Sequence, residues 1–391
     1  MAIRALARMY RPAEELFVHC IRRTKNGDLP EGVSRRYTAI ALIGLATEPP
    51  ETARTVLAGQ DPMDVLGRLL RDSRDSQDLG EVALTLWAAR MFNHPAASMA
   101  LDRLKAMDPV AGQWPTVETA WSLTALVYEK PTEGLPGGDS SMSLHDRPKP
   151  TEGFPWGDLA GQIANRLLAS VNPRSNLFSH WPAGSRSPWL RRHVTCFADA
   201  VYPIQALSHC YLATGRPAAL TAALRCANQI CSLQGPAGQW WWHYDCRTGR
   251  IIEKYPVYSV HQDGMGPMAL LAALRAMAAA QGRACESGMV CDTQCPALMA
   301  AIPPAIDRSL AWMVHSPEIA ASLIDPQAGL IWRKVARHEP GKLVRQAQAL
   351  ASRLHPRLRL PGLGPVFRPT WVDLESRPYH MGWILHAFPG G

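Results

Sequence analysis

A turn phrase that ends in glycine and tryptophan recurs along the chain and limits the folds it can adopt. Three copies, at 108–114, 234–240 and 325–332, have a polar or proline-containing turn, then a glycine, then a tryptophan one to three residues on, and 172–181 is a looser fourth copy. Apolar stripes with helical spacing lie between them. A helical unit that cannot bury its apolar face alone must stack on copies of itself. The pattern therefore predicts an all-α fold, an α/α toroid of about six helical hairpins formed by residues 1–391.

Two segments depart from the helical pattern. Alternation typical of a strand occurs at 250–258, so we expect only short β excursions. Residues 132–157 are rich in Pro, Gly and Ser, which predicts a long loop within the toroid domain or a lid over its cavity. In such a ring, the inner-helix ends and the loops at one mouth are expected to carry the site.

Composition and charge restrict the classes of function. Hydrophobic residues make up 47% of the 391 residues, which is typical of a globular protein with a large core. The net charge is +8, but no block of five or more like charges occurs, which argues against a nucleic-acid arm. A mild basic excess fits an acidic substrate. No apolar run reaches the roughly eighteen residues of a membrane span, and the start lacks a signal core, which favours a cytoplasmic location.

The nine cysteines are expected to be mostly reduced thiols in that compartment. Cys285, Cys291 and Cys295 lie in a stretch that resembles a loop insertion between helices. Their spacing matches no common zinc pattern, and a fourth ligand is not obvious. We therefore expect no metal and no cofactor, and the role of these three thiols and the oligomeric state stay open.

The segment between Gly238 and Gly264 holds many of the candidate functional side chains, because aromatic and titratable residues are concentrated there. Trp, Tyr and His each present an apolar face and a polar tip, which suits the wall of a wet pocket on which sugar rings stack. We expect one or two of the three tryptophans at 240–242 to contact a ligand. The candidate ligand contacts in this segment are Trp240, Trp242, His243, Asp245, Tyr255 and Gln262.

A base beside an anion clamp is the combination that proton abstraction next to a sugar carboxylate requires. Residues 191–193, 255–261 and 377–380 together supply possible bases (Tyr and His) and possible anion-binding groups (Arg and His). The candidate bases are Tyr258, His261, Tyr379 and His380, and the candidate clamp is Arg191, His193 and Arg333. Core or capping roles are the alternative for Tyr258 and His261.

Paired carboxylates would indicate glycoside hydrolysis instead. Asp199 lies in an otherwise apolar helical stretch, where a charge is costly unless it is paired or functional. Asp263 precedes a predicted helix, so an N-cap and a catalytic carboxylate are equally good interpretations. Asp245 and Glu253 complete the candidate acids for this reaction.

Two family resemblances bear on the fold and the substrate. The Gly-x-Trp phrases resemble the repeat of the terpenoid cyclase and protein prenyltransferase toroids, although the Asp-x-Asp-Asp motif of those cyclases and the ordered zinc ligands of the prenyltransferases are missing. Residues 172–388 resemble the toroid domain of the glucuronyl 5-epimerases, through 253–256, 332–333 and 379–380. The first resemblance implies a ring with a central cavity, and the second implies a uronate substrate.

Together these patterns predict a carbohydrate-active enzyme for an acidic sugar or polysaccharide. The reaction is either epimerase- or lyase-type proton abstraction or glycoside hydrolysis. A terpenoid-cyclase-like enzyme for an isoprenoid and a non-catalytic glycan-binding protein are the alternatives. Polar walls of Arg, His and Tyr would favour a sugar, whereas a dry chamber around one acid would favour an isoprenoid.

Overall fold

The computed structural model describes residues 1–128, 157–287, 294–337, 343–355, 357–358, 360 and 366–390. Only the backbone is described for residues 157, 190, 283–287, 294–296 and 343–345. The loop or lid predicted at 132–157 lies outside the described residues, apart from its last position. The same holds for Cys291 and for the side chains of Cys285 and Cys295.

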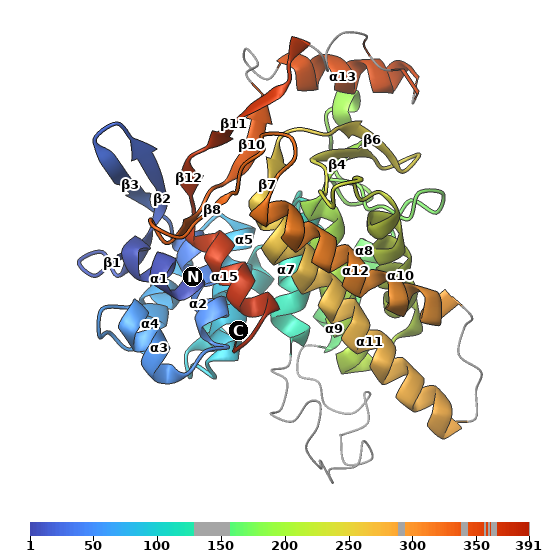
Figure 1. The fold of residues 1–391 in the computed structure, drawn as a ribbon. Coiled ribbons are helices and arrows are strands. Elements are labelled where there is room, and N and C mark those ends of the chain that lie inside the picture. Colours follow the sequence, from blue (N-terminus) through green and yellow to red (C-terminus); the bar gives the residue numbers. More distant parts are fainter. Residues whose placement is uncertain are drawn as a thin grey trace.

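The described helices form a ring with small sheets gathered at one end (Figure 1). Consecutive inner helices pack against each other, and the last packs back against the first, which closes the ring. Several of these helices are apolar on nearly all sides, as expected for helices with no face in water. The inner helices are α2 (Arg35–Leu45), α5 (Leu79–Met91), α7 (Thr116–Val127), α9 (Ala198–Thr214), α11 (Gly266–Ser287) and α15 (Pro378–Ala387).

A second set of helices covers the outside of this ring. The outer helix α4 is amphipathic, because it buries Val65, Leu66, Leu69 and Leu70 on one face. The outer helices are α1 (Ala2–Met9), α3 (Pro50–Val56), α4 (Pro62–Ser73), α6 (Ala97–Ala106), α8 (Gly157–Leu168), α10 (Pro217–Ser232) and α12 (Gln294–Val314). Along the chain one outer helix, or two in the case of α3 and α4, separates each inner helix from the next, and the predicted α/α toroid is confirmed.

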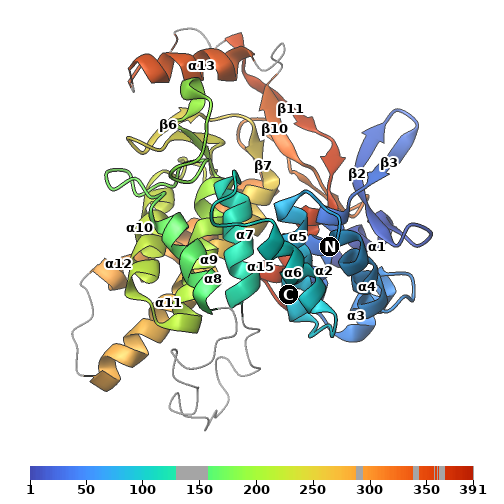
Figure 2. The same cartoon turned by 180° about the vertical axis from the view of Figure 1, so that it is seen from behind.

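The strands and short helical turns lie in the connections that lead from an outer helix to the next inner helix. They therefore gather at the N-terminal ends of the inner helices, where α13 (Leu343–Leu354) lies above them (Figures 1 and 2). The strands are β1 (Tyr10–Arg11), β2 (Leu16–Thr24), β3 (Gly27–Val33), β4 (Val194–Cys196), β5 (His243–Asp245), β6 (Arg250–Glu253), β7 (Val257–Tyr258), β8 (Ile324–Asp325), β9 (Leu330–Ile331), β10 (Lys334–Arg337), β11 (Pro369–Asp373) and β12 (Glu375–Ser376). The turns are η2 (Trp189–Arg191) and η3 (His261–Met265).

Strand content exceeds the single excursion expected at 250–258. That segment does form β6 and β7, but β6 pairs with β5 whereas β7 pairs with β10, so the two are not arms of one hairpin. The β2–β3 hairpin near the N-terminus was not predicted. Its first strand also pairs with β12 from the C-terminal region, a long-range pairing that local alternation does not reveal.

The recurring turn phrases all lie at this same end of the ring. The copies at 108–114, 172–181 and 234–240 follow α6, α8 and α10, and the copy at 325–332 forms the β8–β9 turn after α12. Gly238 has a φ of 94°, and Gly329 has a φ of 65°, conformations that glycine adopts without steric cost. The repeat in the sequence therefore marks the mouth of the toroid.

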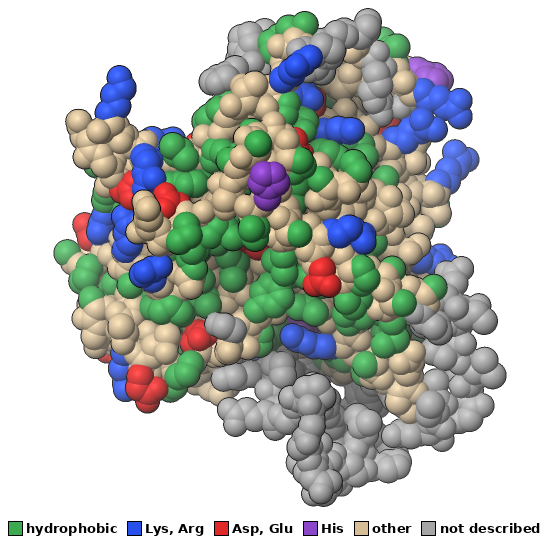
Figure 3. Space-filling model, in the orientation of Figure 1, with side chains coloured by type: hydrophobic (Ala, Val, Ile, Leu, Met, Phe, Trp, Pro, Cys, Tyr) green, Lys and Arg blue, Asp and Glu red, His purple; other side chains and the backbone are tan. Residues whose placement is uncertain are grey.

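No single-sign charge patch stands out on the face in Figure 3. Lys and Arg side chains there are scattered among apolar and acidic ones. Among the described residues, no helix combines the length and the apolarity that a membrane span needs.

The contact between α2 and α15 gives a stability prediction. A Cβ atom on Gly382 would lie 2.8 Å from the backbone carbonyl carbon of Ile40, so the two helices cannot stay this close with alanine at that position. We expect Gly382→Ala to lower the free energy of unfolding by about 3 kcal/mol in urea titrations. Gly161→Ala on α8 is the control, because nothing lies within 4 Å of its added Cβ. Equal stability of the two variants would contradict this packing.

Candidate active site

The mouth of the toroid gathers titratable side chains from the first turns of the inner helices. Acidic groups there are favoured because the N-terminal end of a helix carries partial positive charge. Asp78 is the N-cap of α5, and Glu118 and Asp199 lie in the first turns of α7 and α9. Asp263 lies in η3, directly before α11, and His380 lies in the first turn of α15.

Arg36 joins two of these carboxylates. Its Nη2 atom donates to Oε1 of Glu118 at 2.9 Å and also to Oδ1 of Asp78. The two carboxylate oxygens therefore lie within two hydrogen-bond lengths of each other. The guanidinium also lies 5.4 Å from the centre of the Trp121 ring, which is 5.0 Å from Tyr202.

The two carboxylates differ in burial. Side-chain exposure is 43% for Asp78 and 16% for Glu118. Burial raises the pKa of Glu118 above its usual range; Arg36 opposes this shift and the charge of Asp78 adds to it. Glu118 therefore retains a proton to higher pH than an ordinary glutamate. A cavity of about 630 Å³ beside α2 and α5 is lined in part by Arg36, Tyr37 and Asp78.

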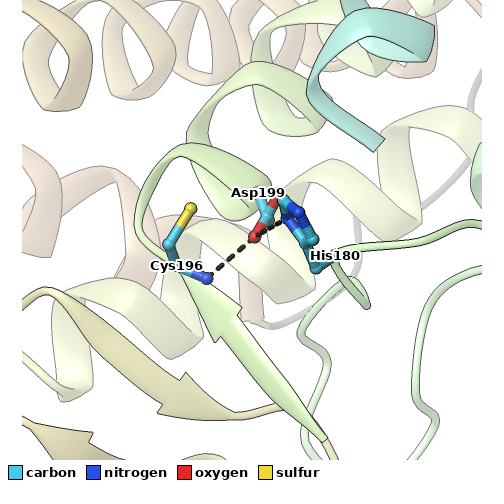
Figure 4. A group of neighbouring side chains, drawn as sticks. All are labelled: His180, Cys196 and Asp199. Carbon is cyan, nitrogen blue, oxygen red and sulfur yellow. Dashed lines mark hydrogen bonds and ion pairs between the residues drawn. The ribbon is translucent and has the colours of Figure 1, made fainter. Parts of the chain in front are cut away.

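Asp199 is fully buried in a cluster with His180 and Cys196 (Figure 4). One carboxylate oxygen accepts from the backbone N–H of Cys196 at 2.8 Å and from the hydroxyl of Thr195 at 3.2 Å. The other lies 3.0 Å from Nδ1 of His180. Burial acts to raise the pKa of Asp199, but His180 and these hydrogen bonds outweigh it and lower the pKa. The charge of Asp199 raises the pKa of His180 in turn.

A second centre lies at η3 and α15. His380 Nε2 lies 2.6 Å from Oδ1 of Asp263, so this carboxylate pairs with a histidine. His261 is buried, and burial, with a smaller effect of His380, lowers its pKa to about 3. Its ring lies 5.2 Å from that of Tyr258 and 6.0 Å from that of Trp242. A neutral imidazole therefore lies close to one that is held by a carboxylate.

Arg333 and Tyr379 lie beside this second centre. The guanidinium of Arg333 is 5.4 Å from the centre of the Tyr258 ring, and its Nη1 atom is 3.2 Å from Glu375. Tyr379 packs 4.7 Å from the Tyr37 ring. Burial raises the pKa of Tyr379 far above its usual value, so its phenol stays protonated and suits a hydrogen-bond donor better than a base.

Two predicted ligand contacts are enclosed by protein atoms. Trp240 is fully buried against Phe197, and its backbone N–H donates to Oε1 of Gln262 at 2.9 Å. The amide of Gln262 donates to the backbone carbonyls of Trp240 and Tyr258. Both residues therefore hold the segment at 240–262 in place and do not face the mouth.

Asp245 and His193 are also bound by neighbouring protein groups. Asp245 accepts from the side chain of Arg247 at 2.7 Å, which fixes the turn between β5 and β6. His193 Nε2 lies 2.9 Å from the hydroxyl of Ser352 on α13, and burial lowers its pKa. His193 therefore packs below α13 instead of joining the anion clamp expected for it.

The other predicted contacts form a wall of rings. Trp242 is half-buried, lies 4.5 Å from Tyr258 and packs 4.9 Å from His243. The hydroxyl of Tyr255 donates to Glu318 at 3.3 Å. Glu253 is paired with Arg337 at 3.0 Å, so this acid is committed to an ion pair.

Arg191 is the predicted clamp residue that remains available. It is exposed on η2, has no ion pair among the described residues, and lies close enough to His180 to lower the pKa of that imidazole. Trp189 on the same turn is 70% exposed, which is unusual for so large an apolar side chain. An unpaired arginine beside an exposed tryptophan suits an acidic sugar ring.

Sequence reasoning missed several residues of the mouth: Arg36, Tyr37, Asp78, Glu118 and His180. Asp78 and Glu118 have the sequence signature of an ordinary N-cap and an ordinary first-turn acid. The available signal was the repeat itself. The copy at 108–114 leads directly into α7, and His180 lies within the copy at 172–181, so this signal could have found Glu118 and His180; no copy precedes α2 or α5, which carry Arg36, Tyr37 and Asp78 at their starts.

Comparison with known proteins supports the fold. No protein-family model and no curated protein matches the sequence. A solved structure of UGL with dGlcA-Glc-Rha-Glc has a TM-score of 0.58 at 11% identity, covering 99% of this chain and 93% of that one. Unsaturated glucuronyl hydrolase from Bacillus sp. GL1, responsible for degradation of glycosaminoglycan, has a TM-score of 0.55 at 12% identity, with coverage of 99% and 93%.

A sugar epimerase from a ruminal bacterium has a TM-score of 0.54 at 8% identity, covering 99% of this chain and 95% of that one. At such low identity these likenesses establish the toroid and leave the reaction open. They do not support the specific resemblance to glucuronyl 5-epimerases or to terpenoid cyclases beyond the ring architecture.

Proposed function

We propose that this protein is an enzyme that cleaves an acidic saccharide at the mouth of the toroid, with Glu118 as the proton donor. The observation that carries the proposal is the pair of carboxylates on Arg36, one with a raised pKa and the other exposed. Glycoside hydrolysis uses one protonated carboxyl group on the leaving oxygen and one ionised carboxylate. Glu118 fits the first role and Asp78 the second.

The surroundings favour a sugar over an isoprenoid. Arg36 lies on both carboxylates of the pair, His180 from the loop before α9 lies close enough to act on Glu118, and Trp121 packs against the guanidinium. In this proposal the exposed Arg191 binds a sugar carboxylate and the exposed Trp189 stacks on a ring. The comparison hydrolase and the comparison epimerase act on carbohydrates by their names, and the UGL structure is named with a saccharide, which agrees with this choice.

Epimerase-type proton abstraction is the second candidate, and the His261–His380 centre favours it. A neutral imidazole next to one that is paired with Asp263 is an arrangement with distinct acid and base partners. Arg333 and Tyr258 lie beside it and would stabilise an enolate. In this reaction Tyr258 and Tyr379 donate hydrogen bonds, and His380, which Asp263 orients, takes the proton.

Isotope labelling separates the two reactions. The protein is incubated with a panel of uronic-acid disaccharides in H₂¹⁸O and, separately, in D₂O. Hydrolysis predicts release of monosaccharides with ¹⁸O at the new hydroxyl group. Epimerisation predicts an intact disaccharide with deuterium on carbon. Turnover of isoprenoid diphosphates with no change in any acidic saccharide would overturn both proposals.

A further inference from the structure

We propose that His180, Cys196 and Asp199 form a binding site for a divalent metal ion of the Zn²⁺ type. One ligand atom from each residue lies within 4.8 Å of the other two. The three residues come from the loop after α8, the end of β4 and the first turn of α9; Figure 4 shows the side chains of His180 and Asp199 meeting, with Cys196 beside them and its backbone nitrogen on the carboxylate. The site is separate from the carboxylate pair on Arg36 and does not depend on the proposed reaction.

The chemistry of the ligands selects the metal. A thiolate, an imidazole and a carboxylate are the three ligand types that Zn²⁺ accepts, whereas Ca²⁺ and Mg²⁺ prefer oxygen alone. Ligand atoms around tetrahedral zinc are about 3.3–3.8 Å apart, given bond lengths of about 2.0–2.3 Å. Side-chain movements of about 1 Å would therefore bring these atoms into coordination distance. Three protein ligands would leave one position open.

The neighbouring groups orient the ligands. Asp199 is held by the backbone N–H of Cys196 and the hydroxyl of Thr195, the kind of outer-shell support that metal-binding carboxylates receive. A fully buried carboxylate is costly in an apolar helix, and a bound cation offsets that cost. His180 has a side-chain exposure of 43%, so an ion can enter from the mouth.

The charges around the cluster permit a cation. Glu118 and Asp199 act on His180 with negative charge, and Arg191 acts with positive charge. Binding of a divalent ion would release the thiol proton of Cys196 and replace the contact between His180 and Asp199. The expectation of no metal was drawn from the spacing of Cys285, Cys291 and Cys295 alone and did not consider these three ligands.

Metal titration of the full chain tests this site. Protein stripped with a chelator is titrated with Zn²⁺ against a chromophoric chelator, and Co²⁺ is added in a parallel experiment to observe the absorption of a thiolate–cobalt bond. We expect one equivalent with such an absorption band, and a loss of affinity of at least about 100-fold together with the band in Cys196→Ser. Zn²⁺ should also raise the Tm of the parent protein and not that of Cys196→Ser.

The other cysteines provide the controls. Cys231→Ser, on α10, should bind the metal as the parent does, and so should a variant that combines Cys285→Ser, Cys291→Ser and Cys295→Ser. Asp199→Asn is a second ligand variant, used only where circular dichroism shows a parent-like fold. Absence of binding, binding that Cys196→Ser leaves unchanged, or binding lost in the triple variant would each overturn the proposal.

Discussion

Glu118→Gln is expected to lower turnover of the acidic saccharide by about 10²–10⁴-fold, the usual contribution of a general acid. Burial and the nearby charge of Asp78 favour the protonated form of Glu118, which can donate to the leaving oxygen. Glutamine retains an oxygen that accepts from Arg36 but has no acidic proton. The kcat of the purified variant, compared with the parent at equal helical content by circular dichroism, measures the effect.

Glu51→Gln is the matched control for this prediction. Glu51 also lies in the first turn of a helix, but the helix is the outer α3 and the side chain is exposed. Turnover by the Glu51→Gln variant should equal that of the parent protein. If Glu118→Gln keeps parent activity while His261→Gln is inactive, the reaction belongs to the histidine centre and the proposed cleavage is wrong.

The second large effect expected is loss of stability in mild acid. Burial lowers the pKa of His209, His261 and His386 from 6.5 to about 3. His209 and His386 also feel the positive charge of Arg275. Because the unfolded chain binds these protons more readily, the stability is fully present above pH 6.5 and is lost as the pH falls towards 3. At pH 5 each of these histidines lowers the free energy of unfolding by about 2 kcal/mol relative to neutral pH.

Urea unfolding at pH 7.5 and pH 5 measures this loss. The free energy of unfolding should be lower at pH 5 than at pH 7.5. In His386→Asn this difference should be smaller by about 2 kcal/mol, because one proton-binding group is removed. His315→Gln should not change the difference, since His315 is exposed at the end of α12. Equal stability of the parent protein at both pH values would contradict the burial of neutral imidazoles.

The ring was predictable because its cause is local. Helical spacing and a repeated turn phrase both lie within short stretches of sequence, and they determine which segments must stack. The strands were less predictable because their partners are distant: β2 pairs with β12 across most of the chain. Short strands such as β7, with Val257 and Tyr258 alone, have no room for an alternating pattern.

The candidate site was partly predictable for a related reason. Asp199 was noticed because a charge in an apolar helix needs a partner, and the structure supplies His180. Glu118 was missed because nothing in its own helix distinguishes it from an ordinary first-turn acid. Its raised pKa comes from burial inside the ring and from the nearby charge of Asp78 before another inner helix, and Arg36 from a third inner helix opposes the shift. Such convergence is a property of the closed ring and not of any one segment.

A crystal structure of Glu118→Gln soaked with a uronic-acid disaccharide tests the central claim most directly. The proposal predicts the sugar carboxylate at Arg191 and the glycosidic oxygen within hydrogen-bond distance of the side chain at position 118. A disaccharide bound only in the groove that Arg250, Lys254 and Arg337 line between β6 and α13, or a mouth that stays empty at saturating ligand, would contradict it.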